Sequence, residues 1–232
     1  MILLSVIIPT YNERENIALL LQQLTQTLSF LAGRYEILVV DDQSPDGTVE
    51  VVQDCVYPAV RVLQRSGVRD LSCALADGFD AARGEFVLAM DADLQHDPSA
   101  VPALLQTAQC SALDVVVASR YVVGGTVQGW SKLRLVLSRN ATRYVRHYLQ
   151  SKTSDPLSGF FLLRRAVWQE VRVRLQPAGF KLLLDILSAK SALQCEDVGY
   201  CFVARQRGRS KFGIKPVLAF LHALWRLRRN AG

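Results

Sequence analysis

The stretch EFVLAMDADLQ, residues 85–95, decides how we interpret the fold. Five consecutive apolar residues at 86–90 include no turn former, and such a run is typical of a strand buried on both faces. The strand leads into Asp91 and Asp93, with Gln95 two residues later. In an open α/β sheet, ligands bind beyond the carboxyl ends of the strands, where carboxylates suit Mg²⁺ or Mn²⁺. Taken alone, the two carboxylates are equally compatible with capping of the helix that begins near Pro98.

Upstream of this stretch, short apolar segments alternate with segments of helical spacing. We expect strands at 3–8, 35–40, 60–63 and 114–117, and helices at 13–31, from 48 onward, at 71–82 and at 98–108. Such alternation predicts a mostly parallel, twisted, open sheet flanked by helices. The strand at 35–40 also ends in acidic residues, Asp41 and Asp42. Capping of a single helix cannot explain acidic residues at the ends of two strands.

Beyond residue 119 the alternation becomes irregular. We expect a mobile loop at 124–129, a long helix at 133–149, a short strand after Phe160, a short helix at 180–189, a last strand at 196–203 and a basic loop at 205–211. Basic residues of the long helix share one face, which fits either a solvated face or contact with phosphate. The pattern at 214–232 predicts an amphipathic helix that either packs on the domain or lies at a membrane surface.

Composition narrows the class of protein. Lys plus Arg outnumber Asp plus Glu by 27 to 21, and this basic excess suits an anionic partner such as a nucleotide, a lipid phosphate or a membrane surface. The five cysteines lack metal-ligand spacing, which favours a reduced intracellular compartment. We expect no signal peptide and no transmembrane helix, because no uncharged apolar run approaches about 18 residues. Nucleic-acid binding would explain the charge but not the acidic strand ends.

Several blocks of the sequence resemble, in order, the family 2 glycosyltransferases of the dolichyl- or polyprenyl-phosphate mannosyltransferase type. The blocks are 6–13 (VIIPTYNE), 39–42 (VVDD), 90–96 (MDADLQH), 119–121 (SRY), 124–125 (GG), 129–130 (GW), 138–139 (SR), Asp155 with 158–160 (SGF), 179–184 (GFKLLL) and 205–211 (RQRGRSK). The resemblance covers about residues 3 to 213 and implies a GT-A-like domain at 1–213, with the amphipathic helix at 214–232 as a separate membrane-surface segment.

The resemblance also implies roles for individual residues. By position, the nucleoside would be held by Pro9, Tyr11, Glu13, Val39, Asp41 and Ala92, and a Mg²⁺ or Mn²⁺ ion by Asp91, Asp93 and Gln95. Catalytic roles fall to Asp91, Asp93, Arg120, Arg205 and Lys211, and the acceptor phosphate would contact Arg134 and Ser138. Arginine offers a phosphate bidentate hydrogen bonding and lysine a point charge.

The implied reaction is transfer of a hexose, with mannose from GDP-mannose as the family's expectation, to a polyprenyl or dolichyl monophosphate. A lipid phosphate has a second pKa near ~6 and is therefore already anionic at neutral pH. It needs positioning more than deprotonation, so we expect one in-line, inverting displacement without an essential general base. His96 accordingly is expected to be a loop residue. The protein is expected on the cytoplasmic face of a membrane as a peripheral protein.

Three alternatives remain open at this point. In the first, the donor is UDP-glucose or another nucleotide sugar. In the second, the acceptor is a saccharide. In the third, the chain is a catalytically silent subunit that binds nucleotide or membrane. Many relatives carry a glycine-rich turn where this chain has residues 69–72, Arg-Asp-Leu-Ser, and this departure leaves the donor preference open.

Overall fold

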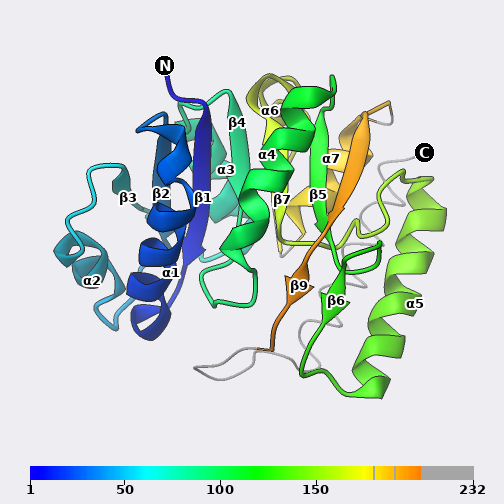
Figure 1. Cartoon of the computed structure of the whole chain (residues 1–232), viewed down its shortest axis with the longest axis horizontal. Coiled ribbons are helices and arrows are strands. Elements are labelled where there is room, and N and C mark those ends of the chain that lie inside the picture. The colour runs from blue at the N-terminus through cyan, green and yellow to red at the C-terminus, as the bar shows by residue number, and fades with distance from the viewer. Residues whose placement is uncertain (180, 191, 205–232) are drawn as a thin grey trace.

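The computed structural model describes residues 1–179, 181–190 and 192–204. Seven strands form one sheet in the order β3-β2-β1-β4-β7-β5-β8 (Figure 1). Its strands are β1 (Leu4–Thr10), β2 (Tyr35–Asp41), β3 (Val60–Gln64), β4 (Phe86–Ala89), β5 (Val115–Ser119), β7 (Phe161–Arg164) and β8 (Cys195–Gly199). All pairings are parallel except those of β7 with its two neighbours. The open, mostly parallel sheet expected from the sequence is confirmed.

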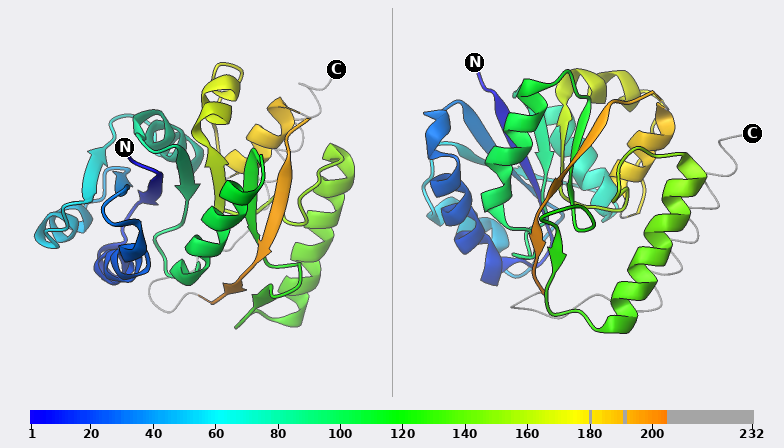
Figure 2. Two further views of the ribbon diagram at one scale, coloured as in Figure 1. Left: turned by 45° about the horizontal axis from the view of Figure 1, so that its top comes forward. Right: turned by 45° about the vertical axis from the view of Figure 1, so that its right-hand side comes forward.

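Helices cover both faces of this sheet, as the rotated views in Figure 2 show. One face carries α1 (Arg14–Thr27), α2 (Thr48–Asp54) and α4 (Val101–Cys110), and the other carries α3 (Leu71–Ala81), α6 (Arg165–Arg172) and α7 (Leu182–Ala189). Successive side chains of a strand point to opposite faces, so Val6 and Ile8 join the first core cluster and Ile7 the second. Both faces are apolar, which is why the strands are continuous hydrophobic runs.

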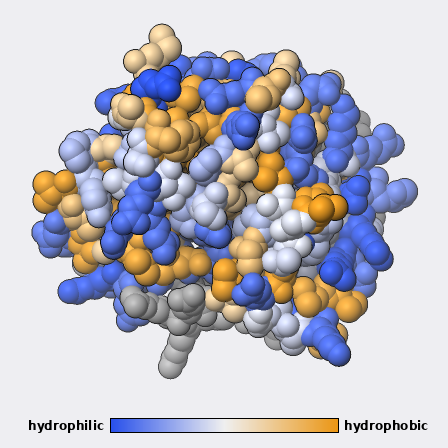
Figure 3. Space-filling model, in the orientation of Figure 1, coloured by the Kyte–Doolittle hydropathy of each residue, from blue (hydrophilic) through white to orange (hydrophobic). Residues whose placement is uncertain are grey.

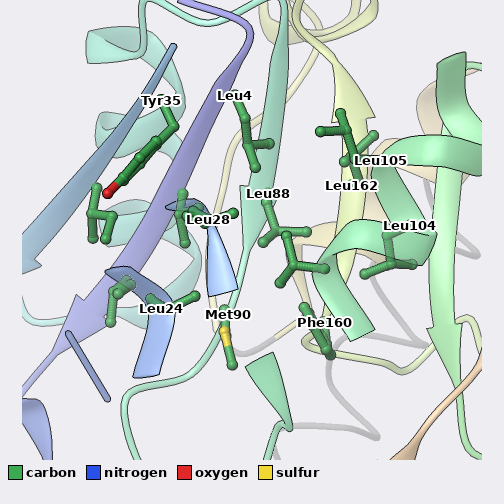
Figure 4. Packing of buried hydrophobic residues seen from close by; sticks show 14 of the residues in the cluster. Leu4, Leu24, Leu28, Tyr35, Leu88, Met90, Leu104, Leu105, Phe160 and Leu162 are labelled. Atoms are coloured by element: carbon green, nitrogen blue, oxygen red, sulfur yellow. The ribbon is translucent and has the colours of Figure 1, made fainter. Parts of the chain in front are cut away.

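The first core cluster extends to the loop that carries the two carboxylates. Figure 4 shows Leu88 of β4 and Met90, directly after it, among side chains of α1 and α4, with Phe160 beside them. Met90 and Phe160 are fully buried. On the opposite face, Gly78 lets α3 approach closely, because a Cβ there would lie 2.3 Å from a methyl group of Ile7. The strand β4 is itself packed on both sides just before the acidic residues, because Leu88 lies in the first core cluster and Ala89 in the second.

Several local expectations were wrong in detail. The helix expected at 13–31 ends at Thr27 and is followed by a 3-10 turn, Ser29–Leu31. The expected last strand is two strands, because the chain leaves β8 at Tyr200 and then forms β9 (Cys201–Phe202), which pairs with β6 (Thr126–Val127) inside the loop expected to be mobile. The helix α6 was not expected at all, although Val167, Trp168 and Val171 place a buried stripe on it.

The long helix α5 (Lys132–Leu149) lies outside the two main cores. Its Val145 packs with Leu157 and Leu184 in a small third cluster, while Leu133, Val136 and Leu137 are more than half exposed. Hydrophilic residues gather along the right-hand margin of Figure 3, where α5 runs in Figure 1. Among the helices of the described ranges, none combines the length and hydropathy needed to cross a bilayer. Arg205, Lys211 and the helix expected at 214–232 lie outside the described residues.

Candidate functional site

The carboxylates of the sequence motif lie where β4 ends, at the carboxyl edge of the sheet. The chain order changes direction between β1 and β4, and open α/β sheets bind ligands at such a switch point. The loop turns at Leu94, whose φ of 61° is a left-handed conformation that a leucine rarely adopts. Within the loop, the backbone N–H of Gln95 donates to Oδ1 of Asp93 (3.2 Å).

Gln95 is held from a second direction. Its side-chain nitrogen donates to the carbonyl of Val203 at 3.1 Å, beyond the end of β9. The amide oxygen is consequently the Gln95 atom that a cation would take. Asp91 keeps 37% of its side chain exposed, and Ala92 between the two aspartates is buried. Two carboxylates and one amide oxygen on a fixed loop form a hard donor set that suits Mg²⁺ or Mn²⁺.

Gly159 adds room beside this loop. A Cβ at residue 159 would lie 3.2 Å from Oδ2 of Asp91, a tighter contact than a side chain normally makes. The missing side chain therefore leaves space next to an oxygen that would hold a cation, and the residues present fit a divalent ion. Among the residues the structure describes, no group of three His, Cys, Asp or Glu side chains is arranged to hold a metal. The rest of the coordination would have to come from Gln95, water or ligand oxygens.

His96 is a buried wall of the site. Its ring stacks on Phe160 at 5.1 Å and meets Tyr200 and Phe202 edge-on, and its Nδ1 accepts the backbone N–H of Asp91. Burial lowers the pKa of His96 to about 4, so the ring is neutral near pH 7. The expectation of an ordinary loop residue understated its structural role, because this ring supports the Asp91 backbone.

The predicted nucleoside residues cluster at the ends of β1 and β2. Asp41 is buried and accepts hydrogen bonds from the Thr10 hydroxyl (3.0 Å) and the Ser44 N–H (2.8 Å). Glu13 is also buried, and its carboxylate accepts the Asn16 amide at 2.7 Å. These internal bonds fix the acceptor oxygens before any ligand is present.

Two other residues of this group differ in their surroundings. Pro9 lies within β1, and Val39 lies within β2 with a fully buried side chain in the core, so Val39 supports the strand that carries Asp41. Tyr11 is half-buried, and the guanidinium of Arg69 lies 4.5 Å from its ring centroid, in cation–π geometry. Arg69 belongs to the segment that departs from the glycine-rich turn.

That departing segment is firmly anchored. Asp70 caps α3 by accepting the Cys73 N–H, and its other oxygen accepts the N–H of Gly179. The backbone N–H of Asp70 donates to Asp42, which in turn pairs with Arg65. The arginine of this loop thus extends from a fixed backbone.

The cationic side of the site begins at Arg120, directly after β5. Its Nε and Nη2 donate to the two oxygens of Asp155 at 2.7 and 2.9 Å. Only 10% of the Arg120 side chain and none of the Asp155 side chain is exposed. Burial alone would lower the Arg120 pKa, but the Asp155 charge outweighs it and raises that pKa above its ordinary value.

Two aromatic rings lie close to Arg120, and each of them contacts a residue of α5. The Arg120 guanidinium lies 5.6 Å from the ring of Trp130 and 5.2 Å from the ring of Tyr121. The Tyr121 hydroxyl shares a 2.8 Å hydrogen bond with Ser138 of α5. The guanidinium of Arg134 lies 4.0 Å from the centroid of the Trp130 ring. The structure therefore brings together Arg120, Arg134 and Ser138, three of the five residues that the resemblance places around phosphate groups; the other two, Arg205 and Lys211, lie outside the described residues.

Lys181 is a site residue to which the sequence assigned no role. It is half-buried, and its Nζ donates to the carbonyl of Leu157 at 2.7 Å. Burial and the neighbouring Arg120 lower its pKa, while Asp91 and Asp155 act in the opposite direction. Lys181 thus lies close enough to interact electrostatically with Asp91 on the carboxylate side of the site and with Arg120 on the cationic side. The signal was present in the 179–184 block, but no spacing rule connects that block to Asp91.

Comparison with known proteins places this geometry in a family. The sequence profile described as "Glycosyl transferase family 2" matches residues 5–172. A "Dolichol-phosphate mannosyltransferase" of Pyrococcus furiosus is 40% identical over 98% of this chain, which spans 64% of the length of that relative. A protein of the same name from Mycosarcoma maydis is 36% identical over 97% of this chain and 79% of its own length. Another from Saccharomyces cerevisiae is 35% identical over 95% of this chain and 85% of its own length.

Solved structures confirm the fold. The glucosyl-3-phosphoglycerate synthase of Mycobacterium tuberculosis, in complex with Mn²⁺, UDP-glucose and glycerol 3-phosphate, superposes with a TM-score of 0.70 over 97% of this chain and 78% of that one, at 17% identity. A complex of the same synthase with Mn²⁺, UDP and phosphoglyceric acid gives 0.71 at 18% identity, over 97% and 76%. The likeness confirms the GT-A-like arrangement, and the profile match shows that the chain belongs to glycosyl transferase family 2.

Proposed function

We propose that this glycosyltransferase transfers mannose from GDP-mannose to a polyprenyl or dolichyl monophosphate, with inversion at the sugar. The observation that carries the proposal is the juxtaposition of two kinds of residue at one edge of the sheet. Asp91 and Asp93 follow β4, and the buried Arg120 follows β5 with Arg134 nearby. The names of the relatives support the lipid phosphate and the sugar.

On the donor side, Tyr11 and the fixed carboxylates of Glu13 and Asp41 bind the nucleoside. Acceptor oxygens that are held by internal hydrogen bonds lose little freedom when a ligand arrives, and this favours tight binding. Asp91, Asp93 and Gln95 hold Mg²⁺ or Mn²⁺, which when bound supplies a Lewis acid that neutralises charge on the leaving nucleoside diphosphate.

On the acceptor side, Arg134 and Ser138 bind the phosphate and Arg120 lies between it and the donor. The phosphate is anionic at neutral pH, so attack on the sugar needs orientation and not a proton acceptor. The environment of His96 does not favour a role as proton acceptor, because its ring is enclosed by aromatic side chains and its Nδ1 already accepts a hydrogen bond. Arg205 and Lys211 are proposed to complete the phosphate contacts from outside the described residues.

Contact with a membrane surface is part of the proposal. The helix α5 exposes Leu133, Val136 and Leu137, and Lys132 and Arg139 are also exposed. Such a combination adds hydrophobic contact to attraction for anionic lipids. We place this surface on the cytoplasmic face, since all five cysteines are free thiols, as in reducing compartments.

The decisive experiment is transfer of labelled sugar into an organic-extractable lipid. Purified protein receives a polyprenyl phosphate, Mg²⁺ or Mn²⁺, and GDP-mannose or UDP-glucose in parallel, with a chelator control. We expect metal-dependent label in the lipid with GDP-mannose, and loss of that label in Asp91→Asn. Label from UDP-glucose alone would overturn the donor, and transfer to a saccharide in place of lipid would overturn the acceptor. Nucleotide binding without any transfer would indicate a silent subunit.

A further inference from the structure

Trp130 lies close to both Arg120 and Arg134, the two arginines of the described residues that the resemblance places around phosphate groups. The guanidinium of Arg134 is 4.0 Å from its ring centroid, and that of Arg120 is 5.6 Å away. Both distances fall within the range of cation–π attraction, which is strongest for tryptophan. Phe202 of β9 packs edge-on against the same indole, with centroids 5.3 Å apart.

The backbone fixes the position of this indole. Gly129 has a φ of 76°, and a Cβ there would lie 2.5 Å from that of Ala204, so only glycine fits. Just before it, the N–H of Gln128 donates to the carbonyl of Phe202. Just after it, the Ser131 hydroxyl accepts the N–H of Arg134 and caps α5. Trp130 therefore occupies a short, rigid link between β6 and α5.

The two arginines repel one another. Burial lowers the pKa of Arg134, and the charge of Arg120 lowers it further. Asp155 compensates Arg120 through two hydrogen bonds. An aromatic face that attracts a guanidinium can hold Arg134 close to Arg120 without adding a carboxylate, which would repel an incoming phosphate.

The Trp130 indole also has a buried donor. Its Nε1 is inaccessible to solvent and has no hydrogen-bond acceptor among the described residues. Native proteins rarely leave such a group unsatisfied. Within the described part of the chain, the Trp130 indole is therefore held by contacts of its ring, and none of these contacts is a hydrogen bond from Nε1. By contrast, the other tryptophan with an arginine over its ring, Trp168, donates its Nε1 to Asp80 at 2.8 Å.

We propose that Trp130 is a positioning residue of the acceptor site, whose indole face holds Arg134 in place for a phosphate monoester. The inference rests on the proposed function, since it assigns Arg134 to the acceptor and not to the donor. Trp130 acts through Arg134 and takes no part in bond making.

The test compares Trp130→Leu with Trp130→Phe in the full-length protein. Leucine removes the π face, and we expect the KM for a polyprenyl phosphate to rise about tenfold, while the KM for the donor and kcat stay within about twofold. Phenylalanine keeps a π face and restores the acceptor KM to within about threefold of wild type. Trp168→Phe, with its own arginine contact far from these residues in the fold, controls for loss of an indole, and thermal unfolding controls for folding.

A second arm tests the route through Arg134. If Trp130 acts by holding Arg134, then Trp130→Leu adds nothing to the acceptor KM of Arg134→Ala. Additive effects, an equal rise in donor KM, or failure of phenylalanine to rescue would overturn the inference. The acceptor is presented both as a short-chain polyprenyl phosphate in detergent and as a long-chain polyprenyl phosphate in vesicles. A loss confined to vesicles would also overturn it, because it would indicate membrane contact.

The activity of the wild-type protein separates failure of the proposed function from failure of the role of Trp130. If the wild-type protein transfers no sugar to either lipid phosphate, then the proposed function is wrong. If the wild type is active and Trp130→Leu leaves the acceptor KM unchanged, only the role of Trp130 is wrong.

Discussion

Asp155→Asn tests whether the buried ion pair with Arg120 organises the cationic half of the site. The substitution keeps the shape of the side chain and removes one charge and one strong acceptor. Asp155 is fully buried, and both of its oxygens accept hydrogen bonds from Arg120. An asparagine can accept through one oxygen only, so Arg120 is left partly unsatisfied and without a compensating charge.

The structure sets the size of the expected effect. Removing one partner of a buried ion pair costs about 3–5 kcal/mol, because the remaining charge stays desolvated. Asparagine retains one acceptor, which places our expectation near the lower limit, about 3 kcal/mol. In a domain of this length each kcal/mol shifts the unfolding midpoint by about 2–4 °C, so the melting temperature should fall by roughly 6–12 °C.

The assay is thermal and urea unfolding, with Glu85→Gln as the matched control. Glu85 pairs with Arg164 at 3.0 Å, but 51% of its side chain is exposed, and exposed pairs contribute about 1 kcal/mol or less. In a double-mutant cycle, Arg120→Gln combined with Asp155→Asn should cost less than the sum of the single changes. A loss no larger than that of Glu85→Gln, or strict additivity in the cycle, would refute the reasoning.

Three further outcomes are expected. Gly159→Ala, which places a Cβ 3.2 Å from Oδ2 of Asp91, should raise the metal concentration for half-maximal transfer about tenfold in a metal titration, without lowering the melting temperature. Arg69→Ala should raise the donor KM about two- to fivefold through loss of its contact with Tyr11, whereas Arg34→Ala at the opposite edge should leave it unchanged. Burial raises the Glu36 pKa, but hydrogen bonds from Ser5, Arg61 and the Arg83 backbone more than offset this and hold the pKa below 4.5. A lowered carboxyl pKa stabilises the fold above the unfolded pKa, so the stability gap between wild type and Glu36→Gln in urea unfolding should shrink as pH falls below 4.5.

The parallel half of the fold was predictable because local pattern and global position agree there. Strands buried on both faces leave continuous apolar runs, and their helices carry the matching stripe. The direction of β7 was not predictable, since Phe161–Arg164 would suit a strand running either way, and pairing with β4 and β5 decides it. The strands β6 and β9 have two residues each, which is too short for an alternation of apolar and polar residues to be recognised in the sequence.

The candidate site divides in the same way. Asp91, Asp93 and Asp41 were predicted because each lies at or just beyond the carboxyl end of a strand, at the edge where sheets of this kind bind ligands. Asp155 and Trp130 were visible only as members of resemblance blocks, because their contacts join segments far apart in the sequence. Arg120 meets Asp155 across 35 residues, and no local rule encodes that distance. Residues that act through another side chain leave the weakest trace in a sequence.

The charges at this edge suggest why Asp155 is buried while Asp91 is not. A site for anions needs cations, yet Arg120 and the half-buried Lys181 raise each other's energy when no ligand is present. Asp155 offsets that repulsion permanently, through two hydrogen bonds to Arg120 from a position without solvent contact. Asp91 remains 37% exposed, where a divalent cation can reach it. Once Asp91 is engaged by a cation, less of its charge compensates Lys181, and an anion beside Lys181 becomes more favourable. Metal and phosphate binding are therefore expected to reinforce each other at the junction of the two halves.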